Sequence, residues 1–365
     1  MNKKILFYLI ISVSAFSLFF LFTEFFGSVT IYSKSGSTNT SKIKEVVPLP
    51  LDTVAYDKKL NEIANNPLPK VIIPKKDKDG NEIPVPITPS QPNIWPVKTT
   101  YPKDGALLPF NRIVAYYGNL YSTKMGVLGE YPEVEMFQKL EAEVKKWQEA
   151  DPETPVIPAL HYIAVVAQGS AGEDGKYRTR MPSAEIDKVI KMAEKINAIV
   201  FLDIQVGFSN VETEIPLLSK YLAMPQVHLA IDPEFSMKGA IRPGKVVGTL
   251  DAADINFASD YLANLVQEHK LTPKILIIHR YTQKMVTNYK QIKILPEVQF
   301  IMNMDGWGEQ AKKINTYQQF IYKEPVQFTG FKLFYKNDLW PPSTGMFAPA
   351  DLLKLRPKPI YIQYQ

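Results

Sequence analysis

Residues 198–234 read AIVFLDIQVGFSNVETEIPLLSKYLAMPQVHLAIDPE, and this stretch contains the repeating unit of the fold. It opens with an apolar run of strand length, Ala198–Gly207, and closes with a second one, Val227–Glu234. Between them, Thr213–Leu222 has a helical pattern. A strand, a helix and a second strand in this order are typical of a parallel βαβ unit.

The same alternation continues through the chain from about residue 110. The predicted strands are Arg112–Gly118, Ala159–Gln168, Ala198–Gly207, Val227–Glu234, Lys274–Arg280, Val298–Asp305, Phe328–Tyr335 and Pro359–Tyr364. The predicted helices are Val134–Ala150, Ser183–Ile196, Thr213–Leu222, Ala252–His269, Thr282–Tyr289, Glu309–Phe320 and Ala348–Leu355. This pattern predicts an α/β fold, a (β/α)8 barrel of the TIM type with eight parallel strands.

A doubly wound open sheet is the alternative fold. It usually has fewer strands, and no Gly-rich phosphate loop follows the first predicted strand here. In the barrel, the sequence ends on the eighth strand, so we expect the last helix to be missing or supplied by the segment before the first strand.

The N-terminus has the pattern of a membrane-targeting segment. Lys3 and Lys4 precede an uncharged run, Ile5–Phe22, which Glu24 ends. The run approaches the ~20 residues that span a bilayer and exceeds the ~7–15 of a signal-peptide core. The two lysines favour a cytoplasmic N-terminus. We therefore expect residues 1–27 to be an uncleaved transmembrane signal anchor, with the rest extracytoplasmic; a cleaved signal peptide, which would give a secreted protein, is the alternative.

A stalk is predicted for residues 28–108. Its first part, Gly27–Thr40, is rich in Ser, Thr and Gly, and prolines are concentrated in Pro48–Pro109. Proline breaks helices and cannot donate to a sheet, which leaves extended chain. We expect a mostly disordered stalk with one short helix at Asp52–Ala64, followed by the barrel domain at residues 109–365.

The composition excludes several classes of protein. The 42 Lys and Arg residues against 37 Asp and Glu residues give a net charge of +5, a diffuse excess that does not indicate nucleic-acid binding. The absence of cysteine excludes a disulfide scaffold, a thiol nucleophile, Cys-ligated zinc and iron–sulfur clusters. Four histidines argue against a His-rich metal centre. P-loop, G-x-G-x-x-G and G-x-S-x-G motifs are missing, so we expect no cofactor and no metal.

Polar residues recur where the predicted strands end, which is where barrel enzymes place their chemistry. In the fourth strand, Leu229 and Ile231 share one face, while Asp232 and Glu234 lie on the other. The predicted catalytic residues are Glu234, Asp232, Asp203 and Asp305. The predicted substrate-binding residues are Tyr116, Tyr117, Gln168, Gln205, His279, Arg280, Trp307, Lys332, Tyr335 and Gln363. His161 and His228 lie early in their predicted strands, so we expect both in the core or at the opposite end.

Paired carboxyl groups in different environments are what glycoside hydrolysis requires. We expect Glu234 to act as the acid, Asp232 to assist it, and Asp203 or Asp305 to supply the second charge. Two alternatives remain open. The segments around Asp232 and Asp305 can be strand-end turns, and the aspartates with His279 can hold Mg, Mn or Zn, although no H-x-H or H-E-x-x-H motif is present.

Loops after the strands add aromatic and basic groups. Trp307 offers a flat ring to a sugar. The loop after the second strand carries Arg178 and Arg180, and the loop after the fourth carries Arg242 and Lys245. These cations are consistent with an acidic glycan, because loops on this face often bind substrate.

Several motifs resemble a family of exported bacterial proteins that are mostly labelled hypothetical or lipoprotein. The motifs are Tyr116-Tyr117-Gly118, Val166-Ala167-Gln168-Gly169, Leu202-Asp203-Ile204-Gln205, Ala230-Ile231-Asp232-Pro233-Glu234, Asp251-Ala252-Ala253, Asp305-Gly306 and Gly330-Phe331-Lys332-Leu333-Phe334-Tyr335. The resemblance covers roughly residues 110–365 and implies export but no reaction. Without a lipobox Cys, attachment is expected through the N-terminal helix itself.

At the level of the fold, the chain is similar to glycoside-hydrolase barrels. Asp232-x-Glu234 resembles the end of the D-x-x-D-x-D-x-E motif of the chitinase-like family, in which the Glu is the acid and the Asp orients the substrate. The chain departs from that motif at Val227 and Ala230, and Lys332 stands where many retaining glycosidases carry a nucleophilic carboxylate.

The sequence therefore predicts a membrane-anchored barrel that acts as a carbohydrate-active hydrolase on a cell-surface or cell-wall glycan. A non-catalytic glycan- or envelope-binding module and a metal-dependent hydrolase or isomerase are the alternatives.

Overall fold

The computed structural model describes residues 48–67 and 93–365. The predicted signal anchor lies outside these ranges, as do residues 28–47 and 68–92 of the predicted stalk. Pro48–Gln365 form one compact unit. Within the described ranges, we find no helix that combines the length and the apolar character needed to cross a membrane.

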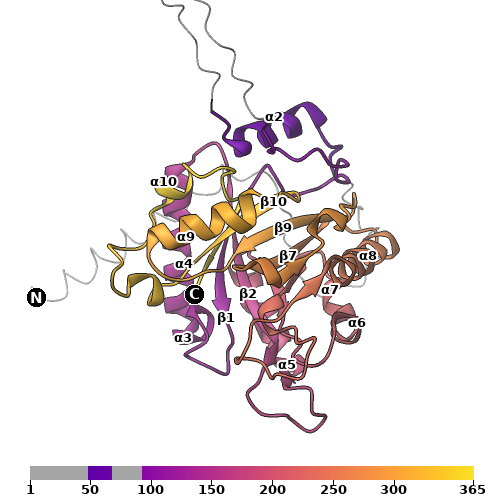
Figure 1. The fold of residues 1–365 in the computed structure, drawn as a ribbon. Helices are drawn as coiled ribbons and strands as arrows, with labels where there is room; N and C mark the ends of the chain where they lie inside the picture. Colours follow the sequence, from indigo (N-terminus) through magenta and orange to yellow (C-terminus); the bar gives the residue numbers. More distant parts are fainter. Residues whose placement is uncertain (1–47, 68–92) are drawn as a thin grey trace, which may run out of the picture. The chain divides into compact units, whose positions relative to one another are not determined.

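The centre of the unit is a closed barrel of parallel strands (Figure 1). Its eight strands are β1 (Arg112–Gly118), β2 (Val156–Ala167), β4 (Ile199–Ile204), β5 (Val227–Ile231), β7 (Lys274–Arg280), β9 (Val298–Met304), β10 (Phe328–Leu333) and β11 (Tyr361–Tyr364). Each pairs in parallel with its neighbours, and β1 closes the ring by pairing with both β2 and β11. The predicted (β/α)8 barrel is confirmed, and the open sheet is excluded.

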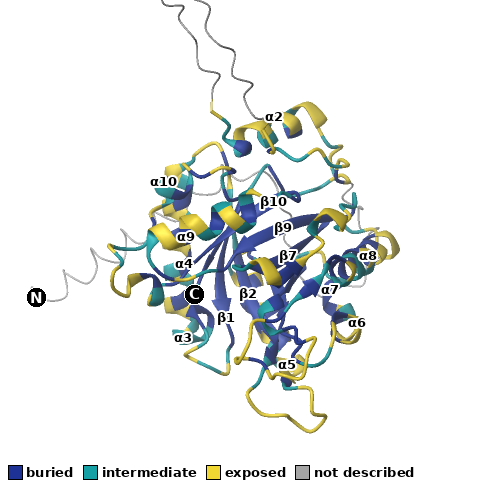
Figure 2. Cartoon of the chain, viewed as in Figure 1, coloured by how far each residue is buried: buried dark blue, intermediate teal, exposed yellow. Residues whose placement is uncertain are grey.

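Helices surround the barrel and connect its strands. They are α3 (Val127–Glu130), α4 (Glu133–Ala150), α5 (Ser183–Lys195), α6 (Val211–Glu214), α7 (Ser219–Leu222), α8 (Ala252–Glu268), α9 (Gln310–Thr316) and α10 (Pro349–Leu352). A π-helical turn, Tyr317–Tyr322, continues α9. The helices are exposed on their outer faces, whereas the barrel strands are mostly buried (Figure 2). The predicted start of α8 is confirmed, because Asp251 and Asp254 form a capping box there.

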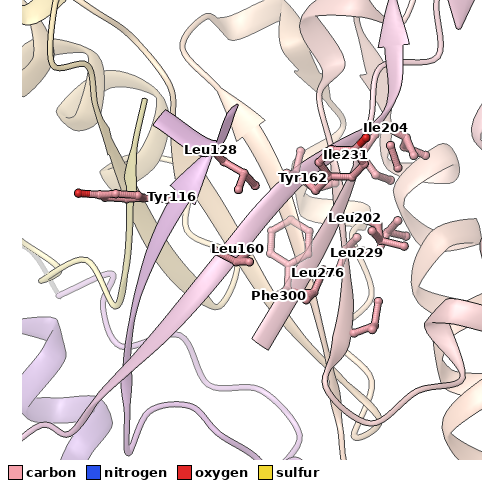
Figure 3. Close-up of a cluster of buried hydrophobic side chains, with 14 of the residues drawn as sticks. Tyr116, Leu128, Leu160, Tyr162, Leu202, Ile204, Leu229, Ile231, Leu276 and Phe300 are labelled. Atoms are coloured by element: carbon pink, nitrogen blue, oxygen red, sulfur yellow. The ribbon is translucent and has the colours of Figure 1, made fainter. Parts of the chain in front are cut away.

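Alternating side chains divide the core into two layers. Outward-facing residues such as Leu160, Leu202, Leu229 and Leu276 pack between the strands and the helices (Figure 3). Inward-facing residues such as Ala230 and Ile277 fill the interior of the barrel. Burying one Leu or Ile side chain contributes about 1.5–3 kcal/mol, so the apolar face of each strand fixes which residues point inward.

One predicted helix is absent. Thr282–Tyr289 forms short 3-10 turns on either side of β8 (Val286–Thr287), which pairs with β6 (Leu250–Asp251). The guanidinium of Arg280 donates to the carbonyls of Thr282, Gln283 and Val286. Because these carbonyls are bound by a side chain, they are not available for a helical ladder.

The compact unit begins earlier than residue 109. The short helix expected near residues 52–64 is α2 (Thr53–Ala64), and its Tyr56 packs against the inner layer of the barrel. The Ile63 carbonyl accepts from the Lys358 N–H at 2.8 Å, and Leu108 exchanges hydrogen bonds with Gln299. The described part of the expected stalk is therefore packed on the barrel, because its apolar residues cover the amino end of the strands.

Candidate functional site

Three of the four predicted catalytic residues gather at the carboxyl ends of the strands. Asp232 follows β5, Glu234 lies in the next 3-10 turn (Pro233–Phe235), and Asp305 follows β9. The Asp232 side chain accepts the Glu234 N–H at 3.0 Å and so caps this turn. The strand-end turn that we considered as an alternative therefore exists, and it is the element that positions Glu234.

Glu234 is the most accessible of these carboxyl groups. It is half-buried, whereas Asp232, Asp305 and Asp203 are buried. Burial and the nearby charge of Asp305 raise the pKa of Glu234 above its ordinary value. The hydroxyl of Tyr281 lies beside the Glu234 carboxyl and partly opposes this shift. A raised pKa keeps a carboxyl group protonated, and able to donate a proton, at higher pH.

Asp232 is more deeply buried than Glu234. Only 3% of its surface is exposed, and burial raises its pKa well above the ordinary value. The charges of Glu234, Asp305 and Asp203 act in the same direction. The Gln205 Nε2 lies 3.4 Å from one Asp232 oxygen, while the Gln205 Oε1 accepts the Ala167 N–H at 3.0 Å.

Asp305 is a carboxylate with two cationic partners, which favour its ionised form. Its two oxygens lie 3.0 Å from the Nζ of Lys332 and 2.9 Å from the Nδ1 of His279. Burial alone would raise the pKa of Asp305, but Lys332 and His279 outweigh it and lower the pKa to about 2. The Nζ of Lys332 also lies 3.9 Å from the centre of the Tyr117 ring, a cation–π contact.

Asp203 lies deeper, between two imidazole rings. One of its oxygens is 3.5 Å from the Nε2 of His161 and 3.7 Å from the Nε2 of His279. Burial favours the neutral form of Asp203, but the two histidines outweigh it and lower its pKa. The same two carboxylates, Asp203 and Asp305, outweigh burial at His279 and raise its pKa, whereas burial lowers the pKa of His161 to about 4.

The three residues His161, Asp203 and His279 have the composition of a metal site. Each offers one ligand atom, and these atoms lie within 4.8 Å of one another. Imidazole and carboxylate together suit zinc and related transition ions.

His161 belongs to this cluster but was not predicted as a site residue. We placed it early in a strand that was predicted to begin at Ala159, but β2 begins at Val156, so His161 lies near its middle. His161 points inward, because it lies opposite Tyr117 of β1. It also shares a strand face with Ile163, which lies opposite Asp203. A strand start at Val156 would have placed His161 near the middle of the strand, and the alternation of side chains along β2 would then have turned it inward. His228 does lie in the core, where its Nδ1 accepts the Ile275 N–H.

Three predicted substrate-binding residues do not join the cluster. Tyr116 and Tyr335 lie in the outer layer, where their hydroxyls are 3.1 Å apart. Arg280 is fully buried and pairs with Glu324 at 2.6 Å. These side chains stabilise the packing of helices and loops on the barrel.

Five of the other predicted residues are buried in the barrel: Tyr117, Gln205, His279, Lys332 and Gln363. Gln168 and Trp307 lie in the loops after β2 and β9. Gln363 is buried and accepts from the Asn303 side chain at 3.1 Å. Trp307 is 45% exposed in the loop after β9, with its ring centre 5.4 Å from that of Trp340.

A cavity of about 330 Å³ opens beside the Glu234 turn. Gln168 lines it together with Phe235, Arg242 and Lys245. The basic loop after β2 has a different role from the expected one, because Arg178 and Arg180 are both bound to the buried Glu214, at 2.9 and 2.7 Å. Of the four cations considered for an acidic ligand, Arg242 and Lys245 are the two that line the cavity.

Comparisons with known proteins find similar folds. No protein-family model and no curated protein matches the chain. Among solved structures, a broad-specificity endoglucanase from Clostridium longisporum is similar with a TM-score of 0.33 and 8% identity, over 62% of this chain and 75% of that one. A Bacillus subtilis mannanase has a TM-score of 0.37 and 11% identity, over 70% and 80%. Dihydropteroate synthase from Burkholderia cenocepacia has a TM-score of 0.31 and 10% identity, over 70% and 86%.

The names of the matched structures differ: an endoglucanase, a mannanase and a synthase. Resemblances of this extent carry no inference about activity, and the fold assignment rests on the strand pairing itself.

Proposed function

We propose that the barrel is a glycan hydrolase in which Glu234 is the proton donor and Asp305 is the second charge. The observation that carries this proposal is the proximity of two carboxyl groups at the carboxyl ends of β5 and β9, where the charge of Asp305 acts on Glu234. One is half-buried beside Tyr281, and the other is held at 3.0 Å by Lys332. Two carboxyl groups in such different surroundings are the requirement for acid-assisted cleavage of a glycosidic bond.

In this mechanism, Glu234 donates its proton to the oxygen of the leaving sugar. Asp232 holds the turn that presents Glu234, through the hydrogen bond from the Glu234 N–H. Asp305 remains negative and stabilises the positive charge that develops at the sugar ring as the glycosidic bond breaks. Water then adds to the anomeric carbon and gives its proton to the ionised Glu234, which restores the acid. Asp203 is the weaker candidate for this second role, because it is fully buried between His161 and His279.

We assign sugar binding to the loops that follow β5 and β9. Trp307 presents an exposed ring, and flat amphipathic rings suit the faces of pyranoses. The cavity beside Phe235 carries Arg242 and Lys245, which favour a sugar with a carboxylate or phosphate group. We therefore place acidic cell-surface or cell-wall glycans first among the substrates.

We also propose that the protein is anchored in the cell membrane by residues 1–27, with the barrel outside. The support is the uncharged run Ile5–Phe22 after two lysines. Fractionation of cells and protease treatment of intact spheroplasts test this proposal. A protease-accessible barrel in the membrane fraction is the expected result, whereas a protected, soluble protein would refute it.

Release of reducing ends tests the proposed activity. A protein comprising residues 48–365, the compact unit, is incubated with neutral and acidic wall and surface glycans. Glu234→Gln should abolish release, while the control Glu268→Gln, which alters an exposed carboxylate on α8, should leave it unchanged. Binding without release in both variants would instead establish a glycan-binding module.

A further inference from the structure

We propose that His161, Asp203 and His279 bind one divalent transition-metal ion of the zinc type at the centre of the barrel. This inference is independent of the proposed glycan hydrolysis, because it concerns the occupancy of a buried site. It rests on unpaired atoms, on the partners of the two imidazoles and on the distances between the ligand atoms.

The first observation is a group of buried polar atoms that face one another without bonding. The Nε2 atoms of His161 and His279 and both oxygens of Asp203 have no hydrogen-bond partner within the described part of the chain. Their separations of 3.5 and 3.7 Å exceed the normal range for a hydrogen bond. All three side chains have 0% exposure, so these atoms are also cut off from solvent. Unpaired buried polar groups are costly, and a bound cation would satisfy the two Nε2 atoms and one Asp203 oxygen at once.

The second observation is that the opposite nitrogen of each imidazole does have a partner. The Nδ1 of His161 lies 2.6 Å from the hydroxyl of Tyr361, and the Nδ1 of His279 lies 2.9 Å from Asp305. When Nδ1–H donates to such a partner, Nε2 is left with a free lone pair directed at Asp203. A histidine oriented by a hydrogen bond at its other nitrogen is the usual arrangement in metal sites.

The third observation concerns spacing. A tetrahedral ion with bonds of about 2.0–2.1 Å separates its ligand atoms by about 3.3 Å. The two distances to Asp203 are close to this value, and the ligand atoms all lie within 4.8 Å of one another. The ligands come from β2, β4 and β7, which are rigid elements of the barrel. Two imidazoles favour a zinc-type ion over Mg²⁺ or Ca²⁺, which prefer oxygen ligands.

The surrounding charges permit a cation. Asp203 is the one acidic group among the three ligands, and the nearby cation Lys332 is engaged by Asp305. In the absence of an ion, a protonated His279 would balance Asp203 instead. That alternative contains no metal, so measuring metal content distinguishes the two states.

The test is metal binding by the compact unit, residues 48–365. The protein is stripped with a chelator, reloaded with Zn²⁺ or Co²⁺, desalted, and analysed by elemental mass spectrometry and by visible absorption of Co²⁺. We expect about one tightly bound ion per chain, a higher Tm with Zn²⁺, and no such effect of Mg²⁺ or Ca²⁺. Absence of bound Zn²⁺ and Co²⁺ from the wild-type protein would overturn the proposal, whatever the variants do.

Variants assign the ion to the site. Asp203→Asn and His279→Gln should each weaken Zn²⁺ binding by about 100-fold or more, and Tyr361→Phe, which removes an outer partner, by about 10-fold. The controls His228→Gln, a buried histidine outside the cluster, and His269→Gln, an exposed one, should bind like wild type. Near-ultraviolet circular dichroism identifies any variant that is unfolded. Undiminished binding in folded Asp203→Asn would refute the assignment, while the test of Glu234 would stand separately.

Discussion

The Nζ of Lys332 lies 3.0 Å from the Oδ1 of Asp305, and both side chains are almost completely buried. Lys332 is on β10 and Asp305 follows β9, so the pair joins neighbouring strands at the mouth of the barrel. Removing one member of a buried pair leaves an uncompensated charge.

Replacement of the lysine measures how much this pair contributes to the free energy of unfolding. Lys332→Met should lower the free energy of unfolding by about 3–5 kcal/mol, because Asp305 keeps its charge and loses the ammonium group that pairs with its Oδ1. The double variant Asp305→Asn/Lys332→Met should recover part of the loss. Urea denaturation checks both values. A loss in the double variant equal to the sum of the losses in Lys332→Met and Asp305→Asn would show that the two side chains do not interact.

The pH dependence of hydrolysis follows from Glu234. Its pKa is raised by burial and by Asp305, and a general acid works only while protonated. The kcat/KM should therefore fall as pH rises through that raised pKa, leaving activity at a higher pH than an ordinary glutamate allows. A pH profile on a glycan substrate measures the basic limb. A profile without a basic limb would exclude Glu234 as the acid.

Glu214 should stabilise the loop after β2. Burial opposes its ionisation, but Arg180, Ser209 and Arg178 outweigh this and lower its pKa. Because the folded pKa is below the unfolded one, the stabilisation is present above the unfolded pKa and is lost as pH falls through the folded pKa.

The variant Glu214→Gln should cost about 3–5 kcal/mol at pH 7, with a smaller difference from wild type in acid. Thermal unfolding between pH 3 and pH 7 tests both statements. The matched control is Glu212→Gln, an exposed residue on the same short helix, which should be neutral. A difference that does not depend on pH would contradict this assignment.

Trp307 should contribute to substrate binding without stabilising the fold. Its ring is 45% exposed. Trp307→Ala should weaken glycan binding by about 0.5–1.5 kcal/mol, seen as a higher KM with kcat nearly unchanged. Tyr101→Ala, an exposed aromatic before β1, is the control. A lower Tm without a change in KM would assign Trp307 to packing instead.

Helix α2 should be an integral part of the folded unit. Tyr56 is 2% exposed against the barrel interior, whereas Val54 on the same helix is 79% exposed. Tyr56→Ala should cost about 3–5 kcal/mol, and Val54→Ala should have little effect. Chemical denaturation of the two variants compares them directly. Equal stability would mean that α2 does not contribute to the core.

The barrel was predictable because buried parallel strands are nearly continuous apolar runs with helices between them. The carboxylates after β5 and β9 were also predictable, since a strand's last residues must lie at one end of the barrel. Thr282–Tyr289 was not, because the carbonyl contacts of Arg280 decide its conformation and depend on tertiary structure.

The strand register decides whether Tyr116 or Tyr117 points into the barrel. Tyr116 and Tyr117 are adjacent, and a single-residue shift exchanges the inner and outer faces. The structure directs Tyr117 to Lys332 and Tyr116 to Tyr335. The position of His161 was concealed for a different reason: an error of three residues at the start of β2 placed it too close to the amino end of the strand.

The pairing of β1 with β11 has a consequence for how the chain folds. Ile113 lies opposite Tyr361, about 250 residues later. While the polypeptide is being made, β1 can pair with β2, but its other edge stays unpaired until this late segment has been synthesised. Contacts between such distant residues slow folding, and an unpaired edge invites association with other chains. Newly made protein should therefore depend on assistance, such as a holding chaperone, through most of its synthesis.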